Sequence, residues 1–174
     1  MNDFSEKYSD TLSQPKRKNP RLKCYDYASP GMYFVTICSK DREMIFGSIR
    51  DGRMVLSEYG ELISRAMCHL HTHYDTVQVD CSVVMPNHVH MIIWISVDNR
   101  TAHTLGNIVR GFKSEVSRKC GKRVWQRGFH EHIIRNEQDL QEIRSYIANN
   151  PIKWDLDRHN PQNERFASWE EPST

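Results

Sequence analysis

Apolar residues along the chain fall into segments whose spacing predicts secondary structure. Six segments have the aromatic and β-branched composition of strands: residues 32–38, 44–49, 53–56, 76–85, 88–95 and 128–135. Asp51-Gly52 between the second and third predicts a hairpin. Only Pro86 and Asn87 separate the fourth and fifth, so we expect these two to form an antiparallel pair at the centre of the fold.

Three other segments carry apolar residues at helical spacing: residues 59–71, 104–120 and 137–149. Pro151 stops the third segment because proline cannot continue a helix. The resulting order is strands, helix, paired strands, helix, strand, helix. That order predicts an α+β fold, a ferredoxin-like sandwich in which helices pack on an antiparallel central sheet.

Composition limits the function only weakly. The chain has 174 residues, which suits one folded domain, and its formal net charge of +2 does not by itself indicate a nucleic-acid partner. Five cysteines without a C-x-x-C spacing predict reduced thiols in a cytoplasmic protein. The first ten residues lack an apolar signal core, and the longest apolar run, 89–95, is too short to span a membrane.

Both ends of the chain are polar. We divide it into a disordered tail with a basic arm (1–24), one folded domain (25–154) and a polar C-terminal tail (155–174). The arm carries five cations without an acid among them: Lys16, Arg17, Lys18, Arg21 and Lys23. It is either a solvated tail or a phosphate-binding arm.

His88-Val89-His90 opens an otherwise apolar strand. Side chains two apart on a strand point the same way, with Cα atoms about 6.6 Å apart, so both imidazoles can reach one metal ion at about 2.0–2.1 Å. Isolated imidazoles in a central strand are costly unless they are hydrogen-bonded or bound. The alternative is two ordinary polar residues near a turn. Two ligands do not complete a metal site, so a third must come from elsewhere.

Tyr146 lies at the edge of the apolar stripe that Leu140, Ile143 and Ile147 form on the third helix. Asn150 is four residues further on, so a phenol and an amide project from one side of the helix end. The simpler interpretation is a boundary core tyrosine and a C-cap asparagine before proline. A residue before proline is also pushed out of the α region, which affects where its side chain points.

Between residues 110 and 127 basic side chains outnumber acids seven to one. Such a run is either a solvated helix face or a surface that follows a phosphate backbone. Trp125 either stacks on a base or packs inside the protein. With the basic arm, this run supplies the candidate DNA-binding residues: Arg21, Lys23, Arg110, Lys113, Lys122, Arg123, Trp125 and Arg127.

Taken together, these features resemble the single-tyrosine HUH transposases, and above all the REP-associated tyrosine transposases of bacteria. HUH denotes histidine, hydrophobic residue, histidine. The resemblance covers about residues 20–154, and H-x-H after Met-Pro-Asn, followed about sixty residues later by the tyrosine helix, is specific. The stretches that carry it are 21–27 (RLKCYDY), 33–38 (YFVTIC), 85–90 (MPNHVH), 125–129 (WQRGF) and 146–153 (YIANNPIK).

The resemblance implies a role for each matching residue. His88 and His90 match the metal-binding pair, Asn150 stands where relatives place a third, amide ligand, and Tyr146 matches the nucleophile. The implied cofactor is Mg²⁺ or Mn²⁺, and histidine and amide ligands suit Mn²⁺ better. The implied activity is cleavage and rejoining of single-stranded DNA, a REP-type hairpin, through a 5′-phosphotyrosine. The implied setting is the bacterial cytoplasm, with a monomer or homodimer on the nucleoid.

Two other functions fit the same motifs. A metal-dependent hydrolase would activate water at His88 and His90, and it would still cleave after Tyr146→Phe. A domesticated relative would grip hairpins without cutting them, and its binding would be insensitive to chelator. A second H-x-H, His130 and His132, could line the active-site cleft.

Overall fold

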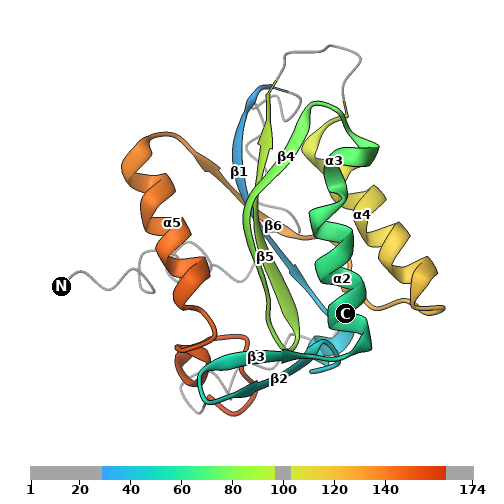
Figure 1. Cartoon of the computed structure of the whole chain (residues 1–174), viewed down its shortest axis with the longest axis vertical. Coiled ribbons are helices and arrows are strands. Elements are labelled where there is room, and N and C mark those ends of the chain that lie inside the picture. Colours follow the sequence, from blue (N-terminus) through green and yellow to red (C-terminus); the bar gives the residue numbers. More distant parts are fainter. Residues whose placement is uncertain (1–28, 97–102, 164–174) are drawn as a thin grey trace.

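The computed structural model describes residues 29–96 and 103–163, and its elements follow the predicted order (Figure 1). The main sheet is antiparallel with the order β4-β5-β1-β6. Its strands are β1 (Gly31–Cys38), β4 (Val77–Val84), β5 (His88–Ile95) and β6 (His130–Ile134), and a separate hairpin pairs β2 (Gly47–Arg50) with β3 (Arg53–Leu56). The helices are α2 (Glu58–Cys68), α3 (Leu70–His73), α4 (Leu105–Lys119) and α5 (Glu137–Asn149), and short 3-10 turns form at η2 (Lys40–Arg42) and η3 (Trp154–Leu156).

These elements confirm the predicted α+β fold, with two local differences. Strand β5 lies inside the sheet, but its partner β4 is an edge strand. The helix predicted over 59–71 is broken at His69, whose backbone leaves the helical region at φ −96° and ψ 9° and whose imidazole Nδ1 lies 2.7 Å from the Arg65 carbonyl. A side chain bonded to the last turn competes with continuation of that helix.

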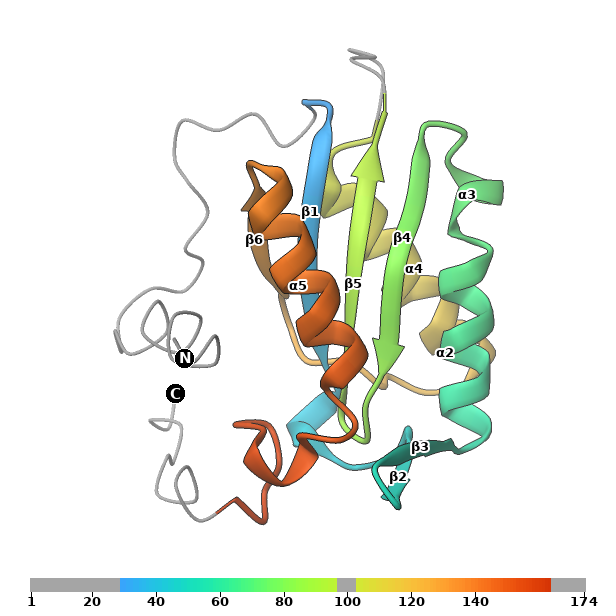
Figure 2. The same ribbon diagram turned by 60° about the vertical axis from the view of Figure 1, so that its left-hand side comes forward.

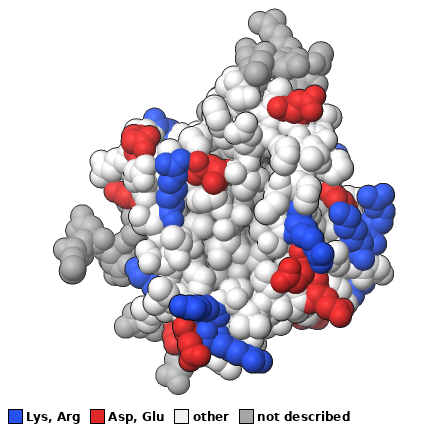
Figure 3. Space-filling model, in the orientation of Figure 1, with Lys and Arg blue, Asp and Glu red and all other residues white. Residues whose placement is uncertain are grey.

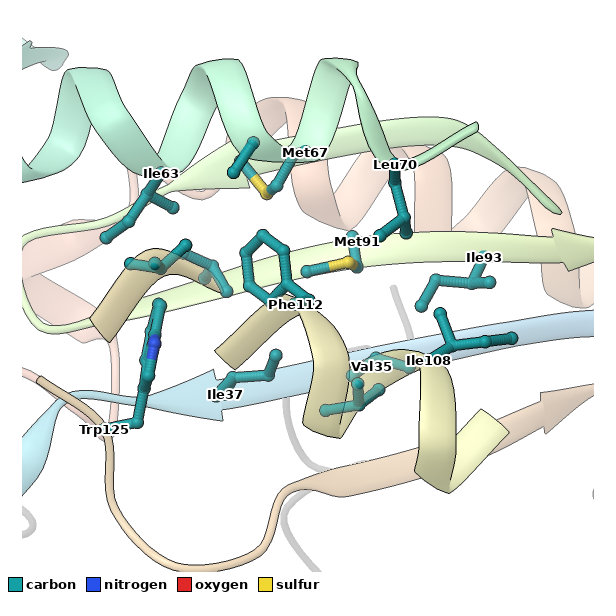
Figure 4. Close-up of a cluster of buried hydrophobic side chains, with 14 of the residues drawn as sticks. Val35, Ile37, Ile63, Met67, Leu70, Met91, Ile93, Ile108, Phe112 and Trp125 are labelled. Atoms are coloured by element: carbon teal, nitrogen blue, oxygen red, sulfur yellow. The ribbon is translucent and has the colours of Figure 1, made fainter. Parts of the chain in front are cut away.

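Helices α2 and α4 cover one face of the sheet and α5 covers the other (Figure 2). The first face holds the larger core, which Figure 4 shows around Phe112 and Trp125. Strand residues Val35, Met91 and Ile93 point into it and are almost fully buried. Val89 also belongs to this core, as the strand alternation predicts.

The α5 face has a smaller apolar cluster. Leu140, Ile143 and Ile147 of α5 pack there on Phe34 and Ile92. Further along the same strands, the positions on this face become polar. This change leaves room for a buried polar site next to the C-terminal half of α5.

After α5 the chain turns back onto the sheet instead of leaving it. Trp154, His159, Asn160 and Asn163 are all buried. Residues 155–163 belong to the segment predicted from the sequence as a polar tail, yet three of their polar side chains, those of His159, Asn160 and Asn163, are buried against the domain. No helix in the described ranges has the length and apolar character needed to cross a membrane. The four cysteines within those ranges are free thiols.

Candidate metal and tyrosine site

His88 and His90 lie side by side on the α5 face at the start of β5. Both are buried, and their Nε2 atoms are 3.0 Å apart. The strand register places Cys38 opposite His88 and Thr36 opposite His90. The two imidazoles therefore converge on one point, as their spacing predicts.

The neighbour of His88 fixes the protonation of its ring. The Asn87 amide nitrogen donates to the carbonyl oxygens of Arg42 (3.2 Å) and His159 (2.6 Å). Its Oδ1 therefore faces His88 Nδ1 at 2.9 Å and can only accept. His88 Nδ1 must carry the proton, so Nε2 presents a lone pair.

Thr36 plays the matching part for His90. Its Oγ1 lies 2.8 Å from His90 Nδ1 and can either donate or accept. His90 therefore has two possible tautomers. With the proton on Nε2, it donates a hydrogen bond to Nε2 of His88; with the proton on Nδ1, it donates to Thr36, and its Nε2 lone pair is available to a cation. A second partner that fixes ring orientation is typical of metal-binding histidines.

Burial keeps both rings neutral. Burial, followed by the positive charges of Arg158 and Arg42, lowers the pKa of His88 to about 3. Burial is also the main reason that the pKa of His90 lies well below its usual value, and a proton on His88 would add to that effect. Neutral imidazole is the form that binds a metal ion.

Tyr146 reaches this point from α5. Its hydroxyl lies 3.4 Å from His90 Nε2, and its ring packs edge-on against Phe34, which also stacks on the His90 ring. Burial and then the Asp157 charge raise the pKa of Tyr146 to about 12. The phenol is therefore protonated at neutral pH and needs help to act as a nucleophile.

Asn150 is buried on the same side of the helix as Tyr146. It keeps helical φ and ψ (−58°, −43°) even though Pro151 follows, so its side chain continues along the face of Tyr146. Its amide hydrogen-bonds to the Tyr146 hydroxyl and thereby lowers the pKa of that phenol. Its Oδ1 is buried and has no hydrogen-bond partner within the described ranges.

Asp157 and His159 complete the group, and the sequence analysis missed both. Asp157 Oδ2 lies 3.9 Å from His88 Nε2, and one ligand atom from each of His88, His90 and Asp157 fits within 4.8 Å of the others. The His159 ring packs 4.5 Å from that of His88. The only sequence signal is Asp-Arg-His inside a polar segment without periodicity, which does not distinguish a tail from a folded loop.

The donor set fits a divalent cation. Two neutral imidazole nitrogens and a carboxylate oxygen surround one point, and an amide oxygen without a partner lies on the adjoining helix turn. A buried acceptor without a donor is costly unless something binds it. The mixture of nitrogen and oxygen ligands suits Mn²⁺ better than Mg²⁺, which prefers oxygen alone.

The second H-x-H lies on the same face but is not part of this group. His130 is opposite Thr36 and His132 is opposite Phe34 in the register of β1 and β6. His132 Nε2 lies 2.9 Å from an oxygen of Asp139 at the start of α5. The contact with Asp139 occupies Nε2 of His132, so this nitrogen is not available as a metal ligand.

The candidate DNA-binding residues on and after α4 are not gathered around the tyrosine. Helix α4 lies on the opposite face of the sheet from α5 (Figure 2). Trp125 is 2% exposed and packs on Phe46 and Phe112, so the packing alternative holds and no ring face is free for a base. Lys113 Nζ donates to the carbonyl oxygens of Gln126 and Gly128 and so ties down the loop.

The other cations of this run have local partners or face solvent. Arg110 donates to Asn107, Arg123 donates to the Trp125 carbonyl, and Lys122 lies over the Tyr59 ring. Arg127 is exposed. On the face drawn in Figure 3, basic and acidic side chains lie beside each other rather than in a single basic patch. The proposed contacts of Arg21 and Lys23 lie outside the described residues.

Known proteins resemble this chain along much of its length. It is 37% identical over 165 residues to an uncharacterized protein of Haemophilus influenzae, and the match covers 82% of this chain and 92% of the relative. A second H. influenzae protein, described as a candidate REP-associated tyrosine transposase, is 26% identical over 74% of each chain. A REP-associated tyrosine transposase of Escherichia coli is 34% identical, but over only 44% of this chain and 45% of its own.

A solved structure, that of a REP-associated tyrosine transposase bound to a REP hairpin, has the same fold, with a TM-score of 0.62. It is 22% identical, and the match covers 82% of this chain and 77% of that one. No family model matches the chain. Fold and site together define a small α+β protein with a histidine pair, a carboxylate and a tyrosine around one point. In sequence the chain is similar to REP-associated tyrosine transposases, and it shares the fold of the solved one.

Proposed function

We propose that this protein is a metal-dependent endonuclease and strand transferase for single-stranded DNA, and that Tyr146 is its covalent nucleophile. One observation carries the proposal: the Tyr146 hydroxyl lies 3.4 Å from Nε2 of His90, beside a group of three side chains with the donor atoms and spacing to hold a metal ion. A phenol in contact with a candidate metal site is an arrangement in which one phosphate can meet both. A tyrosine at the edge of the α5 apolar cluster can pack there without placing its hydroxyl beside the histidine pair.

We further propose that the substrate is a REP-type hairpin with a single-stranded flank. The support is the shared fold with a REP-associated tyrosine transposase that is bound to a REP hairpin, together with sequence relatives named as transposases of this kind. Because the sequence relatives come from bacteria, we place this activity in the bacterial cytoplasm.

His88 and His90 would hold the cation, Mn²⁺ or Mg²⁺, with Asp157 and Asn150 as the oxygen ligands. A bound divalent cation would withdraw charge from the non-bridging oxygens of the scissile phosphate. The four side chains come from β5, α5 and the segment after α5, so the folded domain is needed to bring them together.

The chemical step at Tyr146 is a phosphoryl transfer. The phenol oxygen bonds to phosphorus while the bond from phosphorus to the 3′-oxygen of the preceding nucleotide breaks. The phenol loses one proton and the departing 3′-oxygen gains one, which leaves a 5′-phosphotyrosine and a free 3′-hydroxyl. A 3′-hydroxyl of another strand can attack the same phosphorus in the reverse sense, so the bond energy is kept for rejoining.

The experiment uses one hairpin oligonucleotide labelled at either its 5′ or its 3′ end, with Mn²⁺, with Mg²⁺, or with chelator. Denaturing gels should show a protein–DNA adduct only with the 3′-label, because that fragment carries the new 5′ end. Tyr146→Phe should give no adduct and no cleavage. Cleavage by Tyr146→Phe would favour a water-activating hydrolase, and tight binding without any cleavage would favour a hairpin-binding protein.

A further inference from the structure

The Asn87 amide ties together two segments that are far apart in the sequence. Its Nδ2 donates to the carbonyl of Arg42, in the turn after β1, and to the carbonyl of His159, in the segment after α5. Its Oδ1 meanwhile faces His88 Nδ1. One side chain therefore sets the position of a metal-ligating histidine and of two loops beside it, and each loop carries an arginine: Arg42 in the first and Arg158 in the second.

The Arg42 turn is strained. Asp41 and Arg42 both have positive φ angles, 53° and 54°, in a region that L residues other than asparagine and aspartate seldom enter. Such strain persists only where surrounding contacts enforce it, and it collects at functional sites. Besides the Asn87 bond to the Arg42 carbonyl, the Arg42 N–H donates to the Ser39 carbonyl at 3.3 Å. The protein thus holds an arginine in an unfavourable backbone conformation at the rim of the site.

Both arginines are near enough for their charges to act on the histidines of the site. Burial is the main cause of the lowered pKa values of His88, His130 and His159, and the positive charges of Arg158 and Arg42 contribute to each of these shifts. Arg158 Nε also donates to Nε2 of His159 at 3.3 Å, so its guanidinium is held against that ring. These two cations disfavour protonation of the imidazoles and create a positive field that favours an anion at the site.

Neither arginine has a carboxylate partner among residues 29–96 and 103–163. Arg144, by comparison, forms a two-pronged ion pair with Asp80 elsewhere on the surface. A guanidinium matches a phosphate with two parallel N–H bonds, and it stays charged at every physiological pH.

We propose that Arg42 and Arg158 are phosphate-binding residues that hold the DNA backbone at the His88–Tyr146 site, with Asn87 positioning both. This inference rests on the proposed function for its substrate, a single-stranded phosphodiester. It differs from the sequence expectation, which places the phosphate contacts on the basic arm and on the α4 run.

The test measures binding alone, so it does not depend on cleavage. The full-length chain with Tyr146→Phe is titrated against a fluorescent REP-type hairpin with a single-stranded flank, at several salt concentrations, using anisotropy. In a second series, each flank phosphate is replaced in turn by an uncharged methylphosphonate. The variants are Arg42→Gln, Arg158→Gln and the charge-keeping Arg42→Lys, and Arg65→Gln on the opposite face of the sheet is the control.

Arg42→Gln and Arg158→Gln should each weaken binding about tenfold. Each should also reduce the slope of log K against log salt by about 0.7, the value for one phosphate contact on a single strand. One or two methylphosphonate positions should weaken binding to the parent protein but no longer to these variants. Arg42→Lys should keep the slope while losing part of the affinity, and the control should match the parent.

The inference is overturned if Arg42→Gln and Arg158→Gln, folded as judged by thermal unfolding, keep the parent slope and methylphosphonate profile. Competition by inorganic phosphate is a further check. If phosphate displaces the hairpin equally well from the parent and from the variants, the inference is also overturned, because the arginines then hold no phosphate. A cleavage assay without adduct would contradict the proposed function but leave these binding results intact.

Discussion

The two faces of one sheet have opposite characters although the same strands make both. On the α2 and α4 face, Val35, Val89 and Met91 enter an apolar core. On the α5 face, their neighbours Thr36, His88 and His90 form a buried polar group in which each histidine ring has a hydrogen-bond partner. Because successive side chains on a strand point to opposite faces, one residue contributes to the core while the next contributes to the polar site.

The difference in packing follows the difference in role. The first face is closed by two helices and contains most of the buried large side chains. The second is held by three apolar residues of α5 and by hydrogen bonds to the segment after it. Substitutions on the first face should therefore change the free energy of unfolding, while those on the second should mainly change metal binding and chemistry.

The largest stability effect should come from Phe112→Ala on the first face. Phe112 is 2% exposed and contacts Trp125, so its removal leaves a cavity and lowers the free energy of unfolding by about 3–5 kcal/mol. Chemical denaturation measures the change. Tyr146→Phe on the second face should stay close to the parent, and an equal loss in both variants would contradict the contrast between the faces.

The next effect is a loss of stability in acid that originates on the second face. The pKa of His88 is lowered to about 3 in the folded chain and is near 6.5 when unfolded, so unfolding takes up a proton between these values. The stabilising contribution is complete above pH 6.5 and falls as pH drops. It decreases by about 2–3 kcal/mol for His88 alone by pH 4.5. Metal-free His88→Gln should show a shallower pH dependence in urea unfolding, and a slope as steep as that of the parent would contradict this.

Asn87→Ala should weaken metal binding more than folding. It removes the acceptor that orients the His88 ring, and loss of such a partner typically costs 10–100-fold in metal affinity. Titration with Mn²⁺ followed by electron paramagnetic resonance gives the affinity. Asn107→Ala, which removes an exposed amide on α4 that bonds Arg110, is the matched control. Unchanged Mn²⁺ affinity in Asn87→Ala would exclude the assigned role of its Oδ1.

The smallest effect is expected at the exposed ion pair that links α5 to the edge strand β4. Arg144 Nε donates to Asp80 at 2.8 Å, and Arg144 is two residues before Tyr146. Arg144→Gln should lower the melting temperature less than Phe112→Ala does, because solvent screens exposed pairs. The charge-swapped double variant Asp80→Arg with Arg144→Asp should restore it. A melting temperature that Arg144→Gln leaves unchanged would show that the pair does not hold α5.

The sequence predicted the parts of the site that lie on regular elements. The H-x-H spacing indicates that both imidazoles share a face, and helical spacing indicates that Tyr146 and Asn150 share a side. Neither depends on distant contacts. The relative placement of β5 and α5 is a tertiary property, and only the resemblance to a known family predicted that the histidines and the tyrosine would meet.

What the sequence missed depends on hydrogen bonds between distant segments. Asp157 and His159 lie in a polar stretch without period, and contacts with distant residues, among them the hydrogen bond from Asn87 to the His159 carbonyl and the packing of the His159 ring on His88, bring them to the site. Trp125 was ambiguous for the opposite reason, since a tryptophan in a basic run is as compatible with base stacking as with packing. Its burial became clear only with Phe46 and Phe112 around it.

The central claim is that one chain supplies both the phenol and the histidine pair, with the Tyr146 hydroxyl 3.4 Å from His90 Nε2. The most direct test mixes two inactive variants, Tyr146→Phe and the double variant His88→Ala with His90→Ala, with Mn²⁺ and the labelled hairpin. Assembly within one chain predicts no more covalent adduct from the mixture than from either variant alone, beside a clear adduct from the parent. Adduct restored by mixing would mean that the tyrosine of one copy serves the histidines of another, and would contradict the account.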